Sequence, residues 1–148
     1  MKIDFRIPEK DDLPEILHLM ETFYSIDHYE FDKSVSEKNL ITFLNDSRLG
    51  RLWLICINNQ PIGYIVLTFG FSFEYHGRDA FIDELFIKEE YRSKGIGKKA
   101  MAFIERESSE LGVHAIHLEV ENHNEKANRL YLQQGYTGNN RSLLTKKL

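Results

Sequence analysis

The stretch Tyr91-Arg92-Ser93-Lys94-Gly95-Ile96-Gly97-Lys98 directly follows an apolar run over residues 80–87. This order indicates a strand, a short turn and the first turn of a helix. Glycine in such a turn lets the backbone adopt dihedrals closed to other residues and approach a ligand closely. The first N–H groups of a helix have no partner within it, and the helix dipole favours an anion beside them. Because Arg92, Lys94 and Lys98 add positive charge, the turn predicts a site for a phosphate-bearing ligand.

The glycine spacing does not match other known phosphate loops. Neither the G-x-x-x-x-G-K-[ST] pattern nor the G-x-G-x-x-G pattern of dinucleotide folds is present. Taken alone, the stretch is also compatible with an ordinary strand-to-helix turn carrying solvated lysines. Other parts of the chain are needed to identify the ligand.

Length and composition predict a single domain over residues 1–148. The net charge of −4 does not favour nucleic-acid binding. The one cysteine, Cys56, lies in an apolar run and is expected to be a buried thiol rather than a nucleophile. No apolar stretch is long enough to span a bilayer, and the first residues lack the apolar segment of a signal peptide, so we expect a cytoplasmic location without membrane association.

Hydrophobic periodicity and turn residues predict alternating strands and helices. Asp12 is expected to begin the first helix and a Ser34–Glu37 capping box the second, while Asn58-Asn59-Gln60-Pro61 predicts a hairpin. The expected strands are 2–7, 51–57, 62–69, 79–88 and 113–120, with one or two short strands after residue 136, and the last two helices are 93–111 and 124–134. Residues 70–78 are expected to form an aromatic loop. The chain is therefore expected to be a mixed α/β domain, in which about four helices flank one twisted sheet of six to seven strands.

A second group of polar residues lies in the last predicted helix. Helical spacing brings Asn124, Asn128 and Tyr131 near one face. Tyr131 could pack in the core with its hydroxyl bonded to backbone, or it could donate a proton to a reacting group.

Together, the two groups resemble a known family. Arg92-x-x-Gly95-x-Gly97, followed by Asn124-x-x-Ala127-x-x-x-Tyr131-x-x-x-Gly135-Tyr136, is similar to the GNAT superfamily of acetyl-CoA-dependent N-acetyltransferases, including its polyamine and diamine acetyltransferases. The resemblance extends over essentially the whole chain and implies the GNAT acyl-CoA N-acyltransferase fold. It implies acetyl-CoA as co-substrate, a primary-amine acceptor attacking in a ternary complex, and a homodimer by analogy with small members.

The resemblance also implies roles for individual residues. The pyrophosphate would bind the backbone amides of Ser93, Lys94, Gly95, Ile96, Gly97 and Lys98 beside Arg92. The pantetheine arm would pair with Leu85, Phe86 and Ile87 where two strands splay apart, and would contact Asn124 and Asn128. Tyr131 would protonate the departing thiolate.

The acceptor amine needs a base, because an alkylamine is mostly protonated at neutral pH. Asp83 and Glu84 are the nearest candidates, and regular alternation would send them to opposite faces of the strand, so at most one would face the acceptor. The resemblance aligns Asp83 with the acid of polyamine-acetylating members, whereas an acid at the position of Glu84 is common in bacterial members. Both remain candidates, with Asp83 slightly preferred, and the scattered histidines give no metal site.

Acidic and aromatic residues near the predicted acceptor side suit a cationic amine through charge pairing and cation–π contacts. The candidate substrate-binding residues are Asp27, Tyr29, Glu30, Phe73 and Glu74. These residues could equally be core, interface or solvated positions. A small cationic metabolite is the preferred acceptor, and the alternatives are a peptide or protein N-acetyltransferase and a non-catalytic acyl-CoA-binding module.

Overall fold

A computed structural model describes residues 1–148 and contains one five-stranded sheet in the order β1-β2-β3-β4-β5. The strands are β1 (Ile3–Arg6), β2 (Gly50–Ile57), β3 (Gln60–Ser72), β4 (Gly77–Ile87) and β5 (Ala115–Leu118). The helices are α1 (Leu13–Ile26), α2 (Lys33–Asn45), α3 (Ile96–Glu110) and α4 (Glu125–Gln133), with short 3-10 helices at Lys10–Asp12 and Glu89–Tyr91. Successive strands pair antiparallel except β4 and β5, which are parallel. The mixed α/β architecture and the four helices confirm the sequence prediction.

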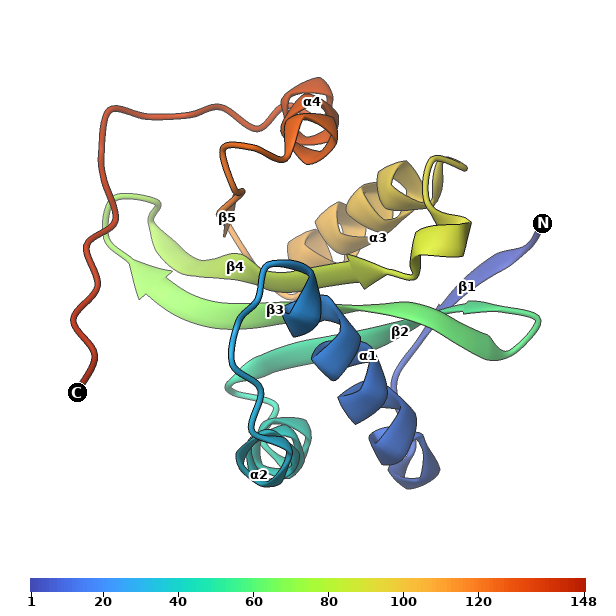
Figure 1. The fold of residues 1–148 in the computed structure, drawn as a ribbon. Helices are drawn as coiled ribbons and strands as arrows, with labels where there is room; N and C mark the ends of the chain where they lie inside the picture. The colour runs from blue at the N-terminus through green and yellow to red at the C-terminus, as the bar shows by residue number, and fades with distance from the viewer.

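Helices cover both faces of the sheet, with α1 and α2 on one side and α3 on the other (Figure 1). Alternating residues of the strands therefore contribute to two separate apolar clusters. The α3-face cluster consists of Trp53, Ile55, Ile62, Ile65, Leu67, Ala80, Ile82, Ile96, Ala100, Met101, Phe103 and Ile104. The α1-face cluster consists of Ile16, Leu17, Leu19, Leu40, Leu52, Leu54, Cys56, Tyr64, Val66 and Phe86, so the thiol of Cys56 is buried as expected.

Two turns show how local sequence sets the element boundaries. Asn58 and Asn59 adopt φ values of 49° and 62° in the hairpin between β2 and β3, which fits the tight turn predicted there. The predicted capping box at Ser34 is wrong. Asp32 begins α2 instead, because its carboxylate accepts hydrogen bonds from the Val35 amide at 3.1 Å and the Ser34 hydroxyl at 2.8 Å.

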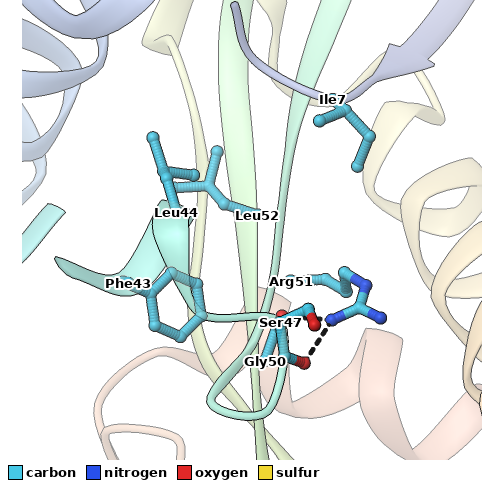
Figure 2. Close-up of a pocket in the computed structure, with 7 residues that line it drawn as sticks. All are labelled: Ile7, Phe43, Leu44, Ser47, Gly50, Arg51 and Leu52. Atoms are coloured by element: carbon cyan, nitrogen blue, oxygen red, sulfur yellow. Dashed lines mark hydrogen bonds between the residues drawn. The ribbon is translucent and has the colours of Figure 1, made fainter. Parts of the chain in front are cut away.

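The corner between α2 and β2 encloses a small pocket of about 80 Å³ (Figure 2). Its walls are mainly apolar, and Arg51 closes one side by donating to the carbonyl oxygens of Ser47 at 2.6 Å and Gly50 at 2.7 Å. The pocket contains none of the predicted site residues. The pocket lies where α2 leads into β2, and its lining residues form no evident catalytic group.

The C-terminal segment differs from the prediction. One or two strands were expected after residue 136, but residues 137–148 have no regular structure, and the sheet has five strands rather than six or seven. The segment runs past the tip of the β3–β4 hairpin (Figure 1), where Arg141 pairs with both carboxylate oxygens of Glu74 at 2.7 Å. Its leucines Leu143 and Leu144 stay exposed, so no buried face sets a strand register.

The predicted aromatic loop is also shorter than expected. β3 extends to Ser72 and β4 begins at Gly77, because residues 70–72 continue to pair with residues 77–79. No helix of the protein is both long and apolar enough to cross a membrane.

A buried glycine tests the packing of β3 against β4. A Cβ at Gly63 would lie 2.1 Å from the carbonyl oxygen of Phe86, so Gly63→Ala must push the two strands apart. We expect a loss of about 1–3 kcal/mol in the free energy of unfolding, the usual effect of overpacking a core, measured by chemical denaturation. Gly138→Ala is the matched control, because nothing lies within 4 Å of the added methyl group. Equal effects of both substitutions would contradict this packing.

Candidate functional site

The sheet opens between β4 and β5. The two strands pair from Asp79 with Ala115 to Ile82 with Leu118, where β5 ends. β4 continues to Ile87 and remains paired with β3 along its other edge. The outer edge of residues 83–87 therefore carries backbone N–H and C=O groups without a strand partner, which could pair with an extended ligand containing amides.

A β-bulge lies at the point where the opening begins. Val66 pairs with Glu84 and Leu67 with Ile82, which leaves Asp83 without a partner on β3. The regular alternation predicted across Asp83 and Glu84 is therefore wrong. Because of the extra residue, Ile82 and Leu85 both pack on the α3-face cluster, although a regular strand would send them to opposite sides.

Glu84 turns toward α1 and accepts two hydrogen bonds. The hydroxyl of Tyr24 donates to Oε2 at 2.6 Å, and the hydroxyl of Tyr64 donates to Oε1 at 2.8 Å. Burial raises the pKa of the Glu84 carboxyl, the two tyrosines oppose that rise, and the negative charge of Asp83 adds to it. Burial, followed by the nearby carboxylates, raises the pKa of both tyrosines, so their hydroxyls remain donors.

Asp83 is placed differently. Its side chain remains accessible to solvent and makes no hydrogen bond or ion pair with another residue. Partial burial alone raises the pKa of its carboxyl. Its charge also raises the pKa of Tyr24, Tyr64 and Glu84, so the two carboxylates belong to one electrostatic group. A carboxylate with a raised pKa and free oxygens can accept a proton from a ligand.

The loop over residues 92–98 follows the open edge. Ser93 and Gly95 have φ values of 60° and 78°, and α3 begins just after Gly95. The Lys99 amide is the first of the helix to find a backbone acceptor, donating to Gly95 at 3.2 Å. The backbone amides of Ser93, Lys94, Gly95, Ile96, Gly97 and Lys98 have no acceptor within the protein, so the loop can bind an anion.

Basic side chains of the loop mainly fix its shape. Arg92 Nε donates to the carbonyl oxygen of Ile87 at 2.7 Å, and its guanidinium lies 5.6 Å from the centre of the Phe86 ring. Lys94 Nζ donates to the carbonyl of Glu90 at 2.8 Å. Lys98 makes no such contact and stays exposed. The hydrogen bond from Arg92 thereby joins the last residue of β4, Ile87, to the loop over residues 92–98.

The two glycines of the motif have separate roles. Gly95 needs glycine for its positive φ, and a Cβ there would meet nothing within 4 Å. Gly97 is helical, but a Cβ there would lie 3.1 Å from Leu130 Cδ2, so this glycine lets α4 approach the start of α3.

The predicted residues of α4 are used partly in its own structure. The Asn124 side chain begins the helix by accepting from the Ala127 amide at 3.2 Å. Asn128 Nδ2 donates to the carbonyl oxygens of Asn124 at 2.9 Å and Glu121 at 3.2 Å. An open depression of about 430 Å³ lies beside them and is lined by Asn122, Glu125, Asn128 and Arg129. Ligand binding by Asn124 and Asn128 stays a prediction.

Tyr131 packs against the α3-face cluster, with its ring 6.1 Å from that of Tyr136 in an edge-on arrangement. Burial raises the pKa of its phenol, and its hydroxyl makes no hydrogen bond within the protein. The phenol therefore stays protonated, and its hydroxyl is free to donate.

The predicted substrate residues fall into two groups. Asp27 lies 3.3 Å from His123 Nε2 and Tyr29 donates to Glu121 at 2.5 Å, so the loop after α1 contacts the segment before α4. The exposed Glu30 makes no ion pair. Phe73 and Glu74 instead lie at the tip of the β3–β4 hairpin, where Phe73 is 91% exposed and Arg141 neutralises Glu74. No hydrogen bond or ion pair joins the two groups.

Sequence reasoning did not identify several residues around the site. Neither Tyr24 nor Tyr64 was singled out as a site residue, because no local sequence pattern links either one to Glu84. The Asp79–His117 pair, with a 3.0 Å separation, lies where β4 meets β5. The rings of Tyr75 and Phe81 each lie 5.0 Å from the His117 ring. The three rings form an aromatic cluster beside the Asp79–His117 pair.

Residues 13–136 match the model of the acetyltransferase (GNAT) family. The chain belongs to the GNAT family. It is 32% identical over 86 residues to YycN, an uncharacterized N-acetyltransferase of Bacillus subtilis, and this match covers 57% of the chain and 54% of YycN.

Solved structures share the GNAT fold seen here. An integron cassette protein from the Cole Harbour salt marsh metagenome aligns with a TM-score of 0.87 and 31% identity over 97% of this chain and 90% of that one. A predicted acetyltransferase of Clostridium acetobutylicum, solved with acetyl-CoA, aligns with a TM-score of 0.81 and 16% identity over 98% and 96% of the two chains.

The raised pKa of Asp83 predicts a stability effect. Above that pKa the folded protein holds a carboxylate that it disfavours, whereas asparagine carries no charge, so Asp83→Asn should raise the free energy of unfolding at pH 7. The gain should disappear as the pH falls through the raised pKa toward the ordinary value of 3.8. Denaturant titrations across this range measure it.

Asp46→Asn is the control of opposite sign. Hydrogen bonds from Arg48 lower the pKa of Asp46, so the substitution should reduce stability at pH 7. A destabilising effect of Asp83→Asn at pH 7 would contradict the assigned environment of Asp83.

Proposed function

We propose that this protein transfers the acetyl group of acetyl-CoA directly to the primary amine of a small cationic metabolite. The observation that carries the proposal is the order of features along residues 83–98. Two carboxylates with raised pKa values stand at one end of an unpaired strand edge, and a loop of free amides stands at the other. The same order is found along acetyl-CoA: the thioester would lie at the carboxylates, the amide-containing arm along the strand edge and the pyrophosphate at the loop.

Acetyl-CoA suits this arrangement chemically. Its pyrophosphate would accept hydrogen bonds from the amides of residues 93–98, assisted by the dipole of α3 and the charge of Lys98. Its pantetheine arm carries two amides, which can pair with the open edge of β4 as an added strand. Acetyl-CoA in the C. acetobutylicum acetyltransferase of the same fold supports this choice of ligand.

The reaction needs a neutral amine beside the thioester. An alkylammonium has a pKa near that of lysine, about 10.4, so at neutral pH it must lose a proton before it can attack. Asp83 is the better placed base, because its oxygens are free whereas each oxygen of Glu84 already accepts a tyrosine hydroxyl. The amine nitrogen then forms a bond to the carbonyl carbon, and the carbon–sulfur bond breaks.

Tyr131 would donate the proton that the departing thiolate needs. Its phenol is protonated, partly buried and free of internal partners. The attacking ammonium group loses two protons as it becomes an amide. Asp83 takes the first and releases it to solvent, and the second replaces, through water, the proton that Tyr131 gives to the thiolate. A backbone amide of the open β4 edge could stabilise the oxyanion.

The acceptor class is inferred from the charge around the site. The open edge begins at two carboxylates, and Asp27, Glu121 and Asp79 lie on the neighbouring segments. Aromatic rings at Tyr29, Tyr75 and Phe81 add surfaces on which an ammonium group can bind. An acceptor with one amine to be acetylated and a second positive charge would suit these surroundings.

A panel of amines tests the proposal, with release of the CoA thiol as the readout. We expect turnover with diamines, polyamines or aminoglycosides, and a kcat/KM at least about fivefold lower for monoamines that lack a second positive charge, since one charge pair contributes roughly 1 kcal/mol. Acetylation of peptide N-termini without turnover of any small amine would instead favour a protein N-acetyltransferase.

Tyr131→Phe distinguishes an enzyme from a module that only binds CoA. We expect kcat to fall about 100-fold, in line with the loss of a general acid, while the affinity for CoA hardly changes. Tyr136→Phe is the matched control, because Tyr136 is a neighbouring half-buried tyrosine whose buried hydroxyl has no hydrogen-bond partner. An unchanged rate in Tyr131→Phe would remove this residue from the mechanism.

A further inference from the structure

Three elements meet at the Glu84 carboxylate. Tyr24 comes from α1, Tyr64 from β3 and Glu84 from β4, and each carboxylate oxygen accepts one tyrosine hydroxyl, at 2.6 and 2.8 Å. The tyrosines lie 60 and 20 residues from Glu84 in the sequence. Neither is needed to explain acetyl-CoA binding or either proton transfer described above.

Packing holds both tyrosines in place. Tyr64 is fully buried, and the ring of Phe23 lies 6.3 Å from it, edge-on. Phe31 makes a similar edge contact with Tyr24 at 5.5 Å, and Phe23 stacks on Phe86 at 5.5 Å. The Glu84 carboxylate is therefore held by two rigid donors rather than by flexible side chains.

We propose that Tyr24 and Tyr64 are positioning residues that keep Glu84 ionised and fixed beside Asp83, so that Asp83 receives the proton of the acceptor amine. This inference rests on the proposed function. Glu84 then supplies a constant negative charge that attracts the ammonium group, while Asp83 supplies the free base.

The electrostatics of the pair support this division. The titratable groups facing Glu84 are Tyr24 from α1, Tyr64 from β3 and Asp83 on its own strand. Donors to a carboxylate favour its charged form, so the two hydroxyls oppose the rise in the pKa of Glu84 that burial and the charge of Asp83 cause. Since the two carboxylates interact, they titrate as a pair with two apparent pKa values.

The pH dependence of kcat/KM tests the proposal in Tyr24→Phe, Tyr64→Phe and the double variant. Phenylalanine keeps each ring but removes the hydroxyl, so Glu84 should take up a proton more readily. We expect the acid limb of the profile to move upward by about one pH unit for each lost hydrogen bond to the carboxylate. An acid limb that stays in place in the double variant would overturn the proposal.

Phe23→Leu controls for packing. It disturbs the same aromatic contacts without removing a hydroxyl, so it should lower the melting temperature and leave the acid limb where it is. An equal shift of the limb in Phe23→Leu would show that packing, not hydrogen bonding, sets the profile, and would overturn the proposal.

Glu84→Gln removes the negative charge at every pH. We expect kcat/KM for the cationic acceptor to fall about fivefold across the whole profile, the effect of losing one charge pair, and the acid limb that remains to report Asp83 alone. Complete loss of activity that no pH restores would assign the base to Glu84 and overturn the division of roles.

A measurement without substrate separates this inference from the proposed function. Carbon NMR titration of the side-chain carboxyls should show the higher apparent pKa of the Asp83–Glu84 pair rising in both tyrosine variants, whichever amine is the acceptor. A rise without any acetylation would uphold the electrostatic role and refute the proposed function. No rise would overturn the inference even in an active acetyltransferase.

Discussion

The candidate site depends on how far β4 pairs with each of its two neighbouring strands. It pairs with β3 along its whole length but with β5 only as far as Ile82, and the bulge at Asp83 falls at the same point. The extra residue keeps Leu85 packed against the α3-face cluster while Glu84 turns toward α1. One irregularity thus accompanies the opening of the strand edge, frees Asp83 and places Glu84 between two tyrosines.

Much of the fold follows from local sequence. Asn58 and Asn59 specify a tight hairpin, and the periodicity of the helices fixes which face they bury. The bulge could not be foreseen, because it concerns which residue of one strand lacks a partner on another, and a single strand carries no signal for that. The C-terminal residues have enough apolar character to suggest strands, but a strand forms only where a neighbouring edge and a buried face fix its register.

The candidate site could be predicted where its chemistry is local in sequence, and less so where it depends on tertiary contacts. Residues 92–98 and the Asp83–Glu84 pair were singled out because glycines, basic residues and acids lie close together in the sequence, and their function stays a prediction. Tyr64 lies within an apolar run and Tyr24 in the segment that was expected to link the first two helices, and neither pattern points to a carboxylate partner. Their hydroxyls gain significance only when the fold brings them to Glu84. Asn124, singled out as a ligand contact, serves first as the N-cap of α4.

Backbone amide hydrogen exchange with and without acetyl-CoA tests the central claim, that the open edge of β4 and the following loop form one binding site. Saturating acetyl-CoA should slow exchange at amides within residues 85–87 and 93–98, and the β2–α2 corner around Gly50 should be unaffected. Protection confined to residues 122–129, around the depression beside α4, would contradict the account. So would binding that protects the loop but leaves the β4 edge exchanging at its free rate.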